Sequence, residues 1–325
     1  IAGGRNLSDS YFGLDTSYNF TDDDLFVEGE RAAREASSAF EELWSAEMTQ
    51  KTKGDARNAK AWSQFCEKDP TRAADEVQEY FSRHSPGLLR QTAVHSCKNV
   101  SLHADLSDFA HPRYGQAFDA NNGTEYMTPM RMKRKLASAS VIDFLGGVKT
   151  NLEGQNWVYL PIGWLASSID RLRAQNIPVQ IMSNADIEGD MELFRNVMEA
   201  GIHWISRRDS KGSQRVMLVS SKGALTDAYA LTPAKAPFFL HAKTLIRDNK
   251  DVIVGSFNLD SRSFNTNLET VVRVNDCPSL AKSVQKRVYE FRKIYHDDLK
   301  LGRVKPKPEP SFFSKMLAMM SMSLL

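Results

Sequence analysis

His241-Ala-Lys243-Thr-Leu-Ile-Arg-Asp248-Asn-Lys-Asp251-Val-Ile-Val-Gly255-Ser256-Phe-Asn258 is the stretch of sequence that decides the fold. Two runs of mostly aliphatic residues flank the polar segment Asp248-Asn-Lys-Asp251, a pattern typical of an antiparallel hairpin. The hairpin would carry Asn249 and Lys250 at its tip. The chain around this stretch is therefore expected to form a β-sheet.

The expected turn also sets the register of the hairpin, pairing His241 with Asn258 and Lys243 with Ser256 on one face. An imidazole, an ammonium, an amide and a hydroxyl together supply a nucleophile or proton donor, a fixed charge and neutral donors, which suits phosphodiester chemistry. Glu269 lies in the next strand-like run, where its carboxylate would hold one ring nitrogen of His241 and fix the tautomer. The alternative is a buried hairpin with an incidental histidine and lysine.

The spacing of His241, Lys243, Asp248 and the Gly255-Ser256-Phe-Asn258 run resembles the repeated motif of the phospholipase D superfamily. The stretch from Asn258 to Glu269 resembles the segment after that motif in bacterial cardiolipin synthases. The resemblance implies an α/β, phospholipase D-like bilobal fold with two pseudo-symmetric halves, each a mixed β-sheet flanked by helices. It implies catalytic roles for His241, Lys243 and Glu269, with Asp248 stabilising the turn, and no metal or other cofactor.

Residues 1–12 repeat residues 253–264, because Ile, Gly, Asn, Leu and Phe coincide at equal positions. The histidine, lysine and aspartate of the first copy would fall before Ile1, so we expect the chain to be a fragment that lacks its first motif. By the resemblance, Gly4, Asn6, Ser256 and Asn258 would bind the substrate phosphate, and Asp24 would orient the missing histidine. A solvated acidic turn is the alternative for residues 22–24.

The expected domains are the remainder of the first half at 1–130, the second half with the complete motif at 131–300, and a linker with an amphipathic helix at 301–325. Apolar periodicity predicts an alternating α/β order. The expected helices cover 30–44, 130–144, 164–175, 187–200 and the segment after Pro278, and the expected strands cover 156–160 and 179–182. Residues 207–237 read as a long polar loop.

The composition limits the functional classes. Of 325 residues, 42% are hydrophobic and the formal net charge is +2, so no global field selects a polyanion. Three widely spaced cysteines, Cys66, Cys97 and Cys277, contain no Cys-x-x-Cys and argue against both a disulfide framework and a zinc site. We therefore expect unpaired thiols in a reducing compartment. The sequence has no apolar run of about 18 residues, so it predicts no membrane-spanning helix.

Two further clusters have competing interpretations. His103, Asp105, Asp108 and His111 lie close together, but their spacing matches no common set of metal ligands, which favours a surface loop. The apolar face of residues 312–324 comes after a basic, proline-rich linker. That face either lies in a membrane interface or docks on the protein core.

The resemblance predicts a phosphatidyltransferase that joins phospholipids by way of a phosphohistidine, with His241 as general acid and base for a second histidine. The expected partners are phosphatidylglycerol-like phospholipids or another phosphodiester, and a peripheral site on the cytoplasmic side of a membrane. Nucleic acid is the less favoured substrate. The chain alone would be inactive, unless a homodimer supplies two copies of His241. A phospholipase D hydrolase, a metal-independent nuclease and a non-catalytic remnant that binds anionic lipid remain as alternatives.

Overall fold

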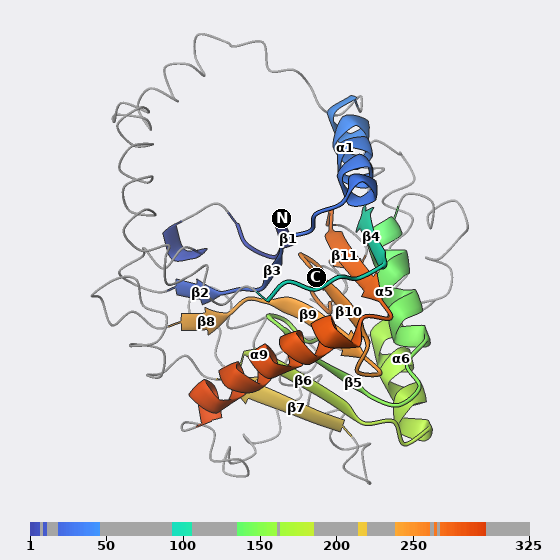
Figure 1. Ribbon diagram of the computed structural model, residues 1–325. Helices are drawn as coiled ribbons and strands as arrows, with labels where there is room; N and C mark the ends of the chain where they lie inside the picture. The colour runs from blue at the N-terminus through green and yellow to red at the C-terminus, as the bar shows by residue number, and fades with distance from the viewer. Residues whose placement is uncertain are drawn as a thin grey trace, which may run out of the picture. The chain divides into compact units, whose positions relative to one another are not determined.

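The computed structural model describes residues 1–6, 9–11, 19–45, 93–105, 135–160, 163–184, 214–219, 238–260, 263–264 and 267–296. Its centre is a seven-stranded mixed sheet with the strand order β4-β11-β10-β9-β5-β6-β7 (Figure 1). The strands are β4 Asn99–Ala104, β5 Leu152–Asn156, β6 Val179–Asn184, β7 Gln214–Val219, β9 Lys243–Arg247, β10 Asp251–Gly255 and β11 Thr270–Asn275. β5, β6 and β7 are parallel, and the other neighbours are antiparallel. The mixed α/β fold predicted from the sequence is confirmed.

Helices cover both faces of this sheet because its central strands are apolar on both sides. On one face, Leu245 and Ile253 pack in a core with α5 (Leu136–Gly146) and α6 (Gly163–Ala174). On the other face, Ile246, Val252 and Val254 pack against Ala281 of α9 (Pro278–His296). In Figure 1, α9 crosses the strands while α5 and α6 lie together beside them. Strands β9 and β10 therefore hold the motif between two packed layers.

The register of the central hairpin differs from the predicted one by one residue. Thr244 lies opposite Val254 and Arg247 opposite Asp251, so the turn contains three residues, 248–250, instead of two. Asp248 and Asn249 both have positive φ, a conformation that these two residue types adopt at lower cost than others. The predicted pairing of Lys243 with Ser256, and of His241 with Asn258, is therefore wrong.

Two other strands differ from prediction. The strand predicted at 156–160 lies earlier, as β5, whose Leu-Glu-Gly-Gln-Asn sequence contains little apolar patterning. Strand β7 occupies part of the stretch 207–237, which was predicted to be a loop. Parallel pairing with β6 supplies the hydrogen bonds that make β7 a strand, and this information is absent from its local sequence.

The helices predicted at 30–44, 130–144, 164–175 and after Pro278 are present as α1 (Glu30–Ser45), α5, α6 and α9. The helix predicted at 187–200, the helical tail at 312–324 and the cluster members Asp108 and His111 lie outside the described residues. In the described part of the chain, no helix has the length and apolar composition needed to cross a bilayer.

The amino-terminal segment is tied to the motif by short strands. β1 (Ala2–Gly3) pairs with β3 (Asp24–Leu25), and β2 (Asn19–Thr21) pairs in parallel with β8 (Phe238–Leu240). Between β1 and β2 lies a short 3-10 helix, Asp9–Tyr11. The backbone N–H of His241 donates to Thr21 O at 2.7 Å and extends the β2–β8 pairing. This pairing brings the acidic residues after Thr21 next to His241.

The sheet edge carries a disulfide between Cys97 and Cys277. Strand β4, which belongs to the stretch assigned to the first half, pairs with β11 so that Asn99 lies opposite Asn275. Cys97 and Cys277 are each two residues beyond that pair, so the register places them opposite one another with Cα atoms 5.6 Å apart. The expectation of unpaired cysteines is wrong, because sequence spacing alone gave no sign that β4 joins this sheet.

Candidate active site

His241 lies between β8 and β9 and is 4% exposed. Its Nδ1 lies 2.6 Å from Oδ2 of Asp22, a carboxylate that is itself buried. With an ionised aspartate, Nδ1 carries the proton and donates it in this hydrogen bond, so that Nε2 keeps its lone pair. Asp22 therefore fixes the tautomer that leaves Nε2 available for chemistry.

Aromatic rings surround the imidazole. The ring centroids of Tyr11 and Trp157 each lie 4.9 Å from that of His241, and the centroid of Phe20 lies 5.2 Å away. The Tyr11 hydroxyl is 3.2 Å from Nε2 and accepts a hydrogen bond from Nδ2 of Asn6 at 2.9 Å. Asn6, predicted to bind phosphate, thus reaches the reactive nitrogen through Tyr11. Neither Tyr11 nor Phe20 was singled out as a site residue from the sequence.

Lys243 places its ammonium against the imidazole. Its Nζ lies 2.8 Å from Nε2 and 2.6 Å from Nδ1 of His241, and it donates to the His241 carbonyl at 2.6 Å. Gly4 makes this approach possible, since a Cβ there would lie 2.9 Å from Cδ of Lys243 and 3.0 Å from Oδ1 of Asp22. The predicted phosphate-binding residue Gly4 therefore borders both the ammonium and the carboxylate.

Burial sets the protonation states of the pair. It lowers the pKa of His241, and the nearby Lys243 charge lowers that pKa further, while the hydrogen bond to Asp22 opposes both effects. Burial lowers the pKa of Lys243 to about 8, against the opposing charges of Asp22, Glu269 and Asp260. At neutral pH the site thus holds a neutral imidazole beside a charged ammonium.

Glu269 contacts residues other than His241. Its carboxylate accepts from Ser256 Oγ at 2.5 Å and from Asn267 Nδ2 at 3.1 Å. Among the described contacts no hydrogen bond joins Glu269 to His241, so the predicted pairing is corrected: Asp22 takes that position. Glu269 acts instead on Lys243, whose charged form it stabilises.

The remaining predicted phosphate ligands have different surroundings. The Ser256 hydroxyl donates to Glu269 and accepts from Thr270 N at 3.0 Å. The Oδ1 atom of Asn258 is buried and has no hydrogen-bond partner within the described ranges. A buried acceptor without a donor is rare and is consistent with a ligand hydroxyl. The phosphate-binding roles of both residues stay predictions.

Asp23, next to Asp22, is a second buried carboxylate. It accepts hydrogen bonds from Arg287 Nε at 2.6 Å, from Thr244 Oγ1 at 3.1 Å and from Gln155 Nε2. These donors come from α9, β9 and β5, so Asp23 anchors the acidic segment to three elements at once. The alternative interpretation of residues 22–24 as a solvated turn is therefore wrong for Asp22 and Asp23, which are both buried.

Asp248 lies in the turn of the β9–β10 hairpin, at the end opposite His241. Its carboxylate accepts from the backbone N–H groups of Lys149, Thr150 and Asn151 and from the Thr150 hydroxyl. Those hydrogen bonds lower the pKa of Asp248. They join the hairpin turn to the segment before β5, which is a structural task.

Asp24 pairs with Arg5, whose Nε lies 2.7 Å from Oδ2. Its predicted role of orienting another histidine stays a prediction.

Asp105 accepts from the N–H groups of Ala137 and Ser138 at the start of α5, while His103 contacts Ser101 within β4. In the described part of the chain, no three histidine, cysteine, aspartate or glutamate side chains gather in a way that suits a metal ion.

The sequence is similar to one protein family and to two proteins of known sequence. Residues 159–294 match the family model described as "Cardiolipin synthase, PLD-like domain". Two uncharacterized proteins of Helicobacter pylori, from strains 26695 and J99, are 25% and 24% identical over 98% of the chain. The chain spans 62% of the length of each of these relatives.

Several solved structures are also similar. The phospholipase D family member Nuc from Salmonella typhimurium is 14% identical, with a TM-score of 0.35, over 60% of this chain and 96% of that one. Phosphatidylserine synthase from Haemophilus influenzae is 13% identical, with a TM-score of 0.44, over 69% of this chain and 46% of that one. NucT from Helicobacter pylori is 18% identical, with a TM-score of 0.35, over 52% of this chain and 91% of that one.

Proposed function

Because residues 159–294 match the family model described as "Cardiolipin synthase, PLD-like domain", we propose that the protein is a phosphatidyltransferase acting on phospholipid phosphodiesters. The observation that carries the proposal is the contact between Asp22 and His241 Nδ1, with the Lys243 ammonium at 2.8 Å from Nε2. This arrangement supplies a nitrogen with a fixed lone pair and a positive charge where an anionic phosphoryl group would arrive.

In the proposed reaction, a second histidine attacks phosphorus, and the bond from phosphorus to the leaving oxygen breaks. In this step His241 acts as the imidazolium, a minority form at neutral pH because the pKa of the ring is lowered, and Nε2 gives its proton to the leaving alkoxide. In the second step, the incoming alcohol attacks the phosphohistidine, the phosphorus–nitrogen bond breaks, and Nε2 recovers the proton from that alcohol. The lowered pKa of His241 favours release of the proton to the leaving alkoxide in the first step.

One contact, one glycine and one unpaired oxygen describe how the site would receive a phosphodiester. The Tyr11 hydroxyl occupies the position beside Nε2 and gives way to the substrate oxygen. Lys243 holds a non-bridging oxygen, with Gly4 leaving room beside the ammonium. The unpaired Oδ1 of Asn258 accepts from the hydroxyl of the incoming alcohol. Each role rests on an atom that the fold leaves next to the reactive nitrogen or without a partner.

The proposal needs a second histidine and a lipid surface. A longer form of the protein or a second copy in a homodimer would supply that histidine. Phosphatidylglycerol in a membrane to which the protein binds peripherally would supply donor and acceptor. Cardiolipin is then the expected product. These partners rest on the likeness to the family and on the site chemistry.

The test is incubation of the protein with vesicles of labelled phosphatidylglycerol, followed by thin-layer chromatography. The 325-residue chain and a form extended by any upstream coding sequence are both assayed. Cardiolipin formation that is abolished by His241→Ala and kept by His103→Ala supports the proposal. Release of free glycerol without cardiolipin would instead indicate hydrolysis. Cleavage of DNA in chelator, with no lipid product, would replace the proposal with a nuclease.

A further inference from the structure

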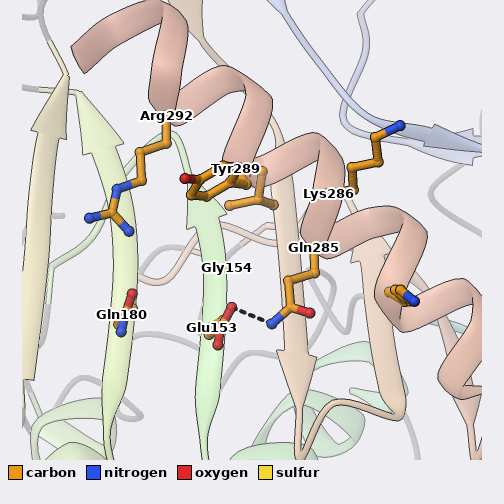
Figure 2. A pocket seen from close by; sticks show the side chains of 9 residues that line it. Glu153, Gly154, Gln180, Gln285, Lys286, Tyr289 and Arg292 are labelled. Atoms are coloured by element: carbon orange, nitrogen blue, oxygen red, sulfur yellow. Dashed lines mark hydrogen bonds between the residues drawn. The ribbon is translucent and has the colours of Figure 1, made fainter.

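A hollow of about 420 Å³ lies between helix α9 and strands β5 and β6. Figure 2 shows it lined from the helix by Gln285, Tyr289 and Arg292, and from the strands by Glu153 and Gln180. Its volume is in the range of sites that hold small organic ligands. It shares no lining residue with the site around His241.

The side chains of α9 divide into two faces at this place. Ala281 and Val284 pack on the sheet core, whereas Lys282, Gln285, Tyr289 and Arg292 recur at intervals of three or four residues and form the face that borders the hollow. The helix thus turns a polar, basic stripe toward the sheet surface at β5 and β6. Among the cations of this stripe Lys282 is exposed, whereas Arg292 is partly buried.

The charges in the hollow are not balanced by the protein. Lys282, Lys286 and Arg292 line it, against the single carboxylate of Glu153. That carboxylate already accepts from Gln285 Nε2 at 2.9 Å and from Asn151 Nδ2 at 3.1 Å. Lys286 pairs with Glu290 on the outer side at 3.6 Å.

Arg292 and Lys282 have no ion-pair or hydrogen-bond partner anywhere in the described part of the chain. Arg292 is half-buried, so its guanidinium has given up part of its water without gaining a carboxylate. In Figure 2 the Arg292 side chain extends from α9 toward Gln180 of β6. The Arg292 guanidinium, the Lys282 ammonium and the side-chain amide of Gln180 therefore border the same space.

We propose that this hollow is a second binding site, separate from the His241 site, for the phosphate group of a small phosphorylated polyol. A guanidinium fork binds two phosphate oxygens at once, and Lys282 adds a point charge. Gln180 and Tyr289 provide neutral polar groups at the rim. The Glu153 carboxylate, on the neighbouring strand, accepts from a hydroxyl of the polyol. The same chemistry is present in a soluble glycerol phosphate and in the head group of phosphatidylglycerol.

The position of the hollow relates it to the His241 site. Glu153 and Asn156 are both in β5, and Asn156 pairs with Lys243 in the neighbouring strand. Three residues of strand correspond to about 10 Å. The binding site needs no turnover, so a protein that contains the second histidine, fails to transfer phosphatidyl groups and still binds at α9 would overturn the proposed function and leave this site standing.

The experiment is isothermal titration of the full chain with sn-glycerol 3-phosphate, and co-sedimentation with phosphatidylglycerol or phosphatidylcholine vesicles. The double variant K282Q/R292Q removes the two unpaired cations. The control K98Q/K149Q removes two exposed cations elsewhere and makes the same change in net charge. Thermal melting of each variant by circular dichroism verifies that it is folded.

Because the His241 site also attracts phosphate, the readout is the part of binding that K282Q/R292Q removes. We expect K282Q/R292Q to weaken binding of the soluble probe about tenfold or more, and the control to leave it within about twofold. Loss seen only with phosphatidylglycerol vesicles would assign the site to the lipid head group, and loss with the soluble probe would assign it to free phosphate esters. Equal binding by both double variants, or no binding by the wild type to either probe, would overturn the site.

Discussion

The Asp22 carboxylate and the His241 imidazole lie 2.6 Å apart across 219 positions of sequence. Parallel pairing of β2 with β8 produces this contact, since Thr21 lies opposite Leu240 and the next residue of each strand enters the site. The orientation of the reactive nitrogen therefore depends on the amino-terminal segment, whereas its charge partner Lys243 is only two residues away.

Asp22→Asn should lower kcat by about 10²- to 10⁴-fold, because the amide cannot hold the Nδ1 proton as the carboxylate does. It should also lower the pKa of His241 further, since Asp22 favours the charged ring. Steady-state transfer kinetics and the titration of the His241 ring protons by NMR measure the two effects. Glu269→Gln is the matched comparison, and if it shifted the His241 titration as much as Asp22→Asn, the assignment of Asp22 would be wrong.

Gly4→Ala should reduce transfer strongly, because the new Cβ would lie 2.9 Å from Lys243 Cδ and 3.0 Å from the Asp22 carboxylate. Overpacking of this kind costs about 1–3 kcal/mol, either in stability or in displaced catalytic groups. Gly146→Ala is the control, since a Cβ there meets nothing within 4 Å. Chemical denaturation and activity assays on both variants decide the matter, and equal activity of the two would argue against close packing at Gly4.

The affinity for substrate should fall as the pH rises through about 8, because the Lys243 ammonium loses its proton there. The sign is set by burial: the pKa of this lysine lies below its ordinary value, so the charged form dominates only on the acidic side of that pH. A profile of KM against pH measures the effect. In Lys243→Arg the guanidinium stays charged, and the rise in KM near pH 8 should disappear; a profile that kept it would assign the limb to another group.

The disulfide between Cys97 and Cys277 should leave one alkylatable thiol in the denatured, unreduced chain and three after reduction. It closes a loop across a sequence separation of 180, and Cys277→Ser should lower the free energy of unfolding by about 2–5 kcal/mol. Mass spectrometry of labelled peptides and urea denaturation with and without reductant test these outcomes. Three reactive thiols before reduction would contradict the pairing.

The sequence was sufficient to predict the hairpin, helices α1, α5, α6 and α9 and the mixed α/β class, because periodicity and turn residues act locally. It misplaced β5, whose polar sequence becomes a strand only through pairing on both sides. It missed β7 for the same reason. Non-local pairing also explains why the cysteines were read as unpaired.

Within the site, the motif identified His241 and Lys243 directly because their spacing is short. The partner of His241 was misassigned, since Glu269 and Asp22 are both acidic residues near apolar strands and only the β2–β8 pairing distinguishes them. Tyr11, Phe20 and Asp23 had no motif to mark them. The positive φ angles in the hairpin turn, beginning at Asp248, also shifted the register that the sequence had suggested.

The hydrogen bonds of Asp248 to residues 149–151 have a consequence for genetics. Because this carboxylate stabilises a turn remote from His241, a mutational scan that measured only activity would group its substitution with those of the catalytic residues. A variant such as Asp248→Asn should instead behave as a temperature-sensitive folding lesion, recovering turnover when the cells are grown cold. The aspartate of the motif that also contains His241 and Lys243 would then serve the assembly of the fold, and its presence in a distant homologue would be no proof that the homologue is active.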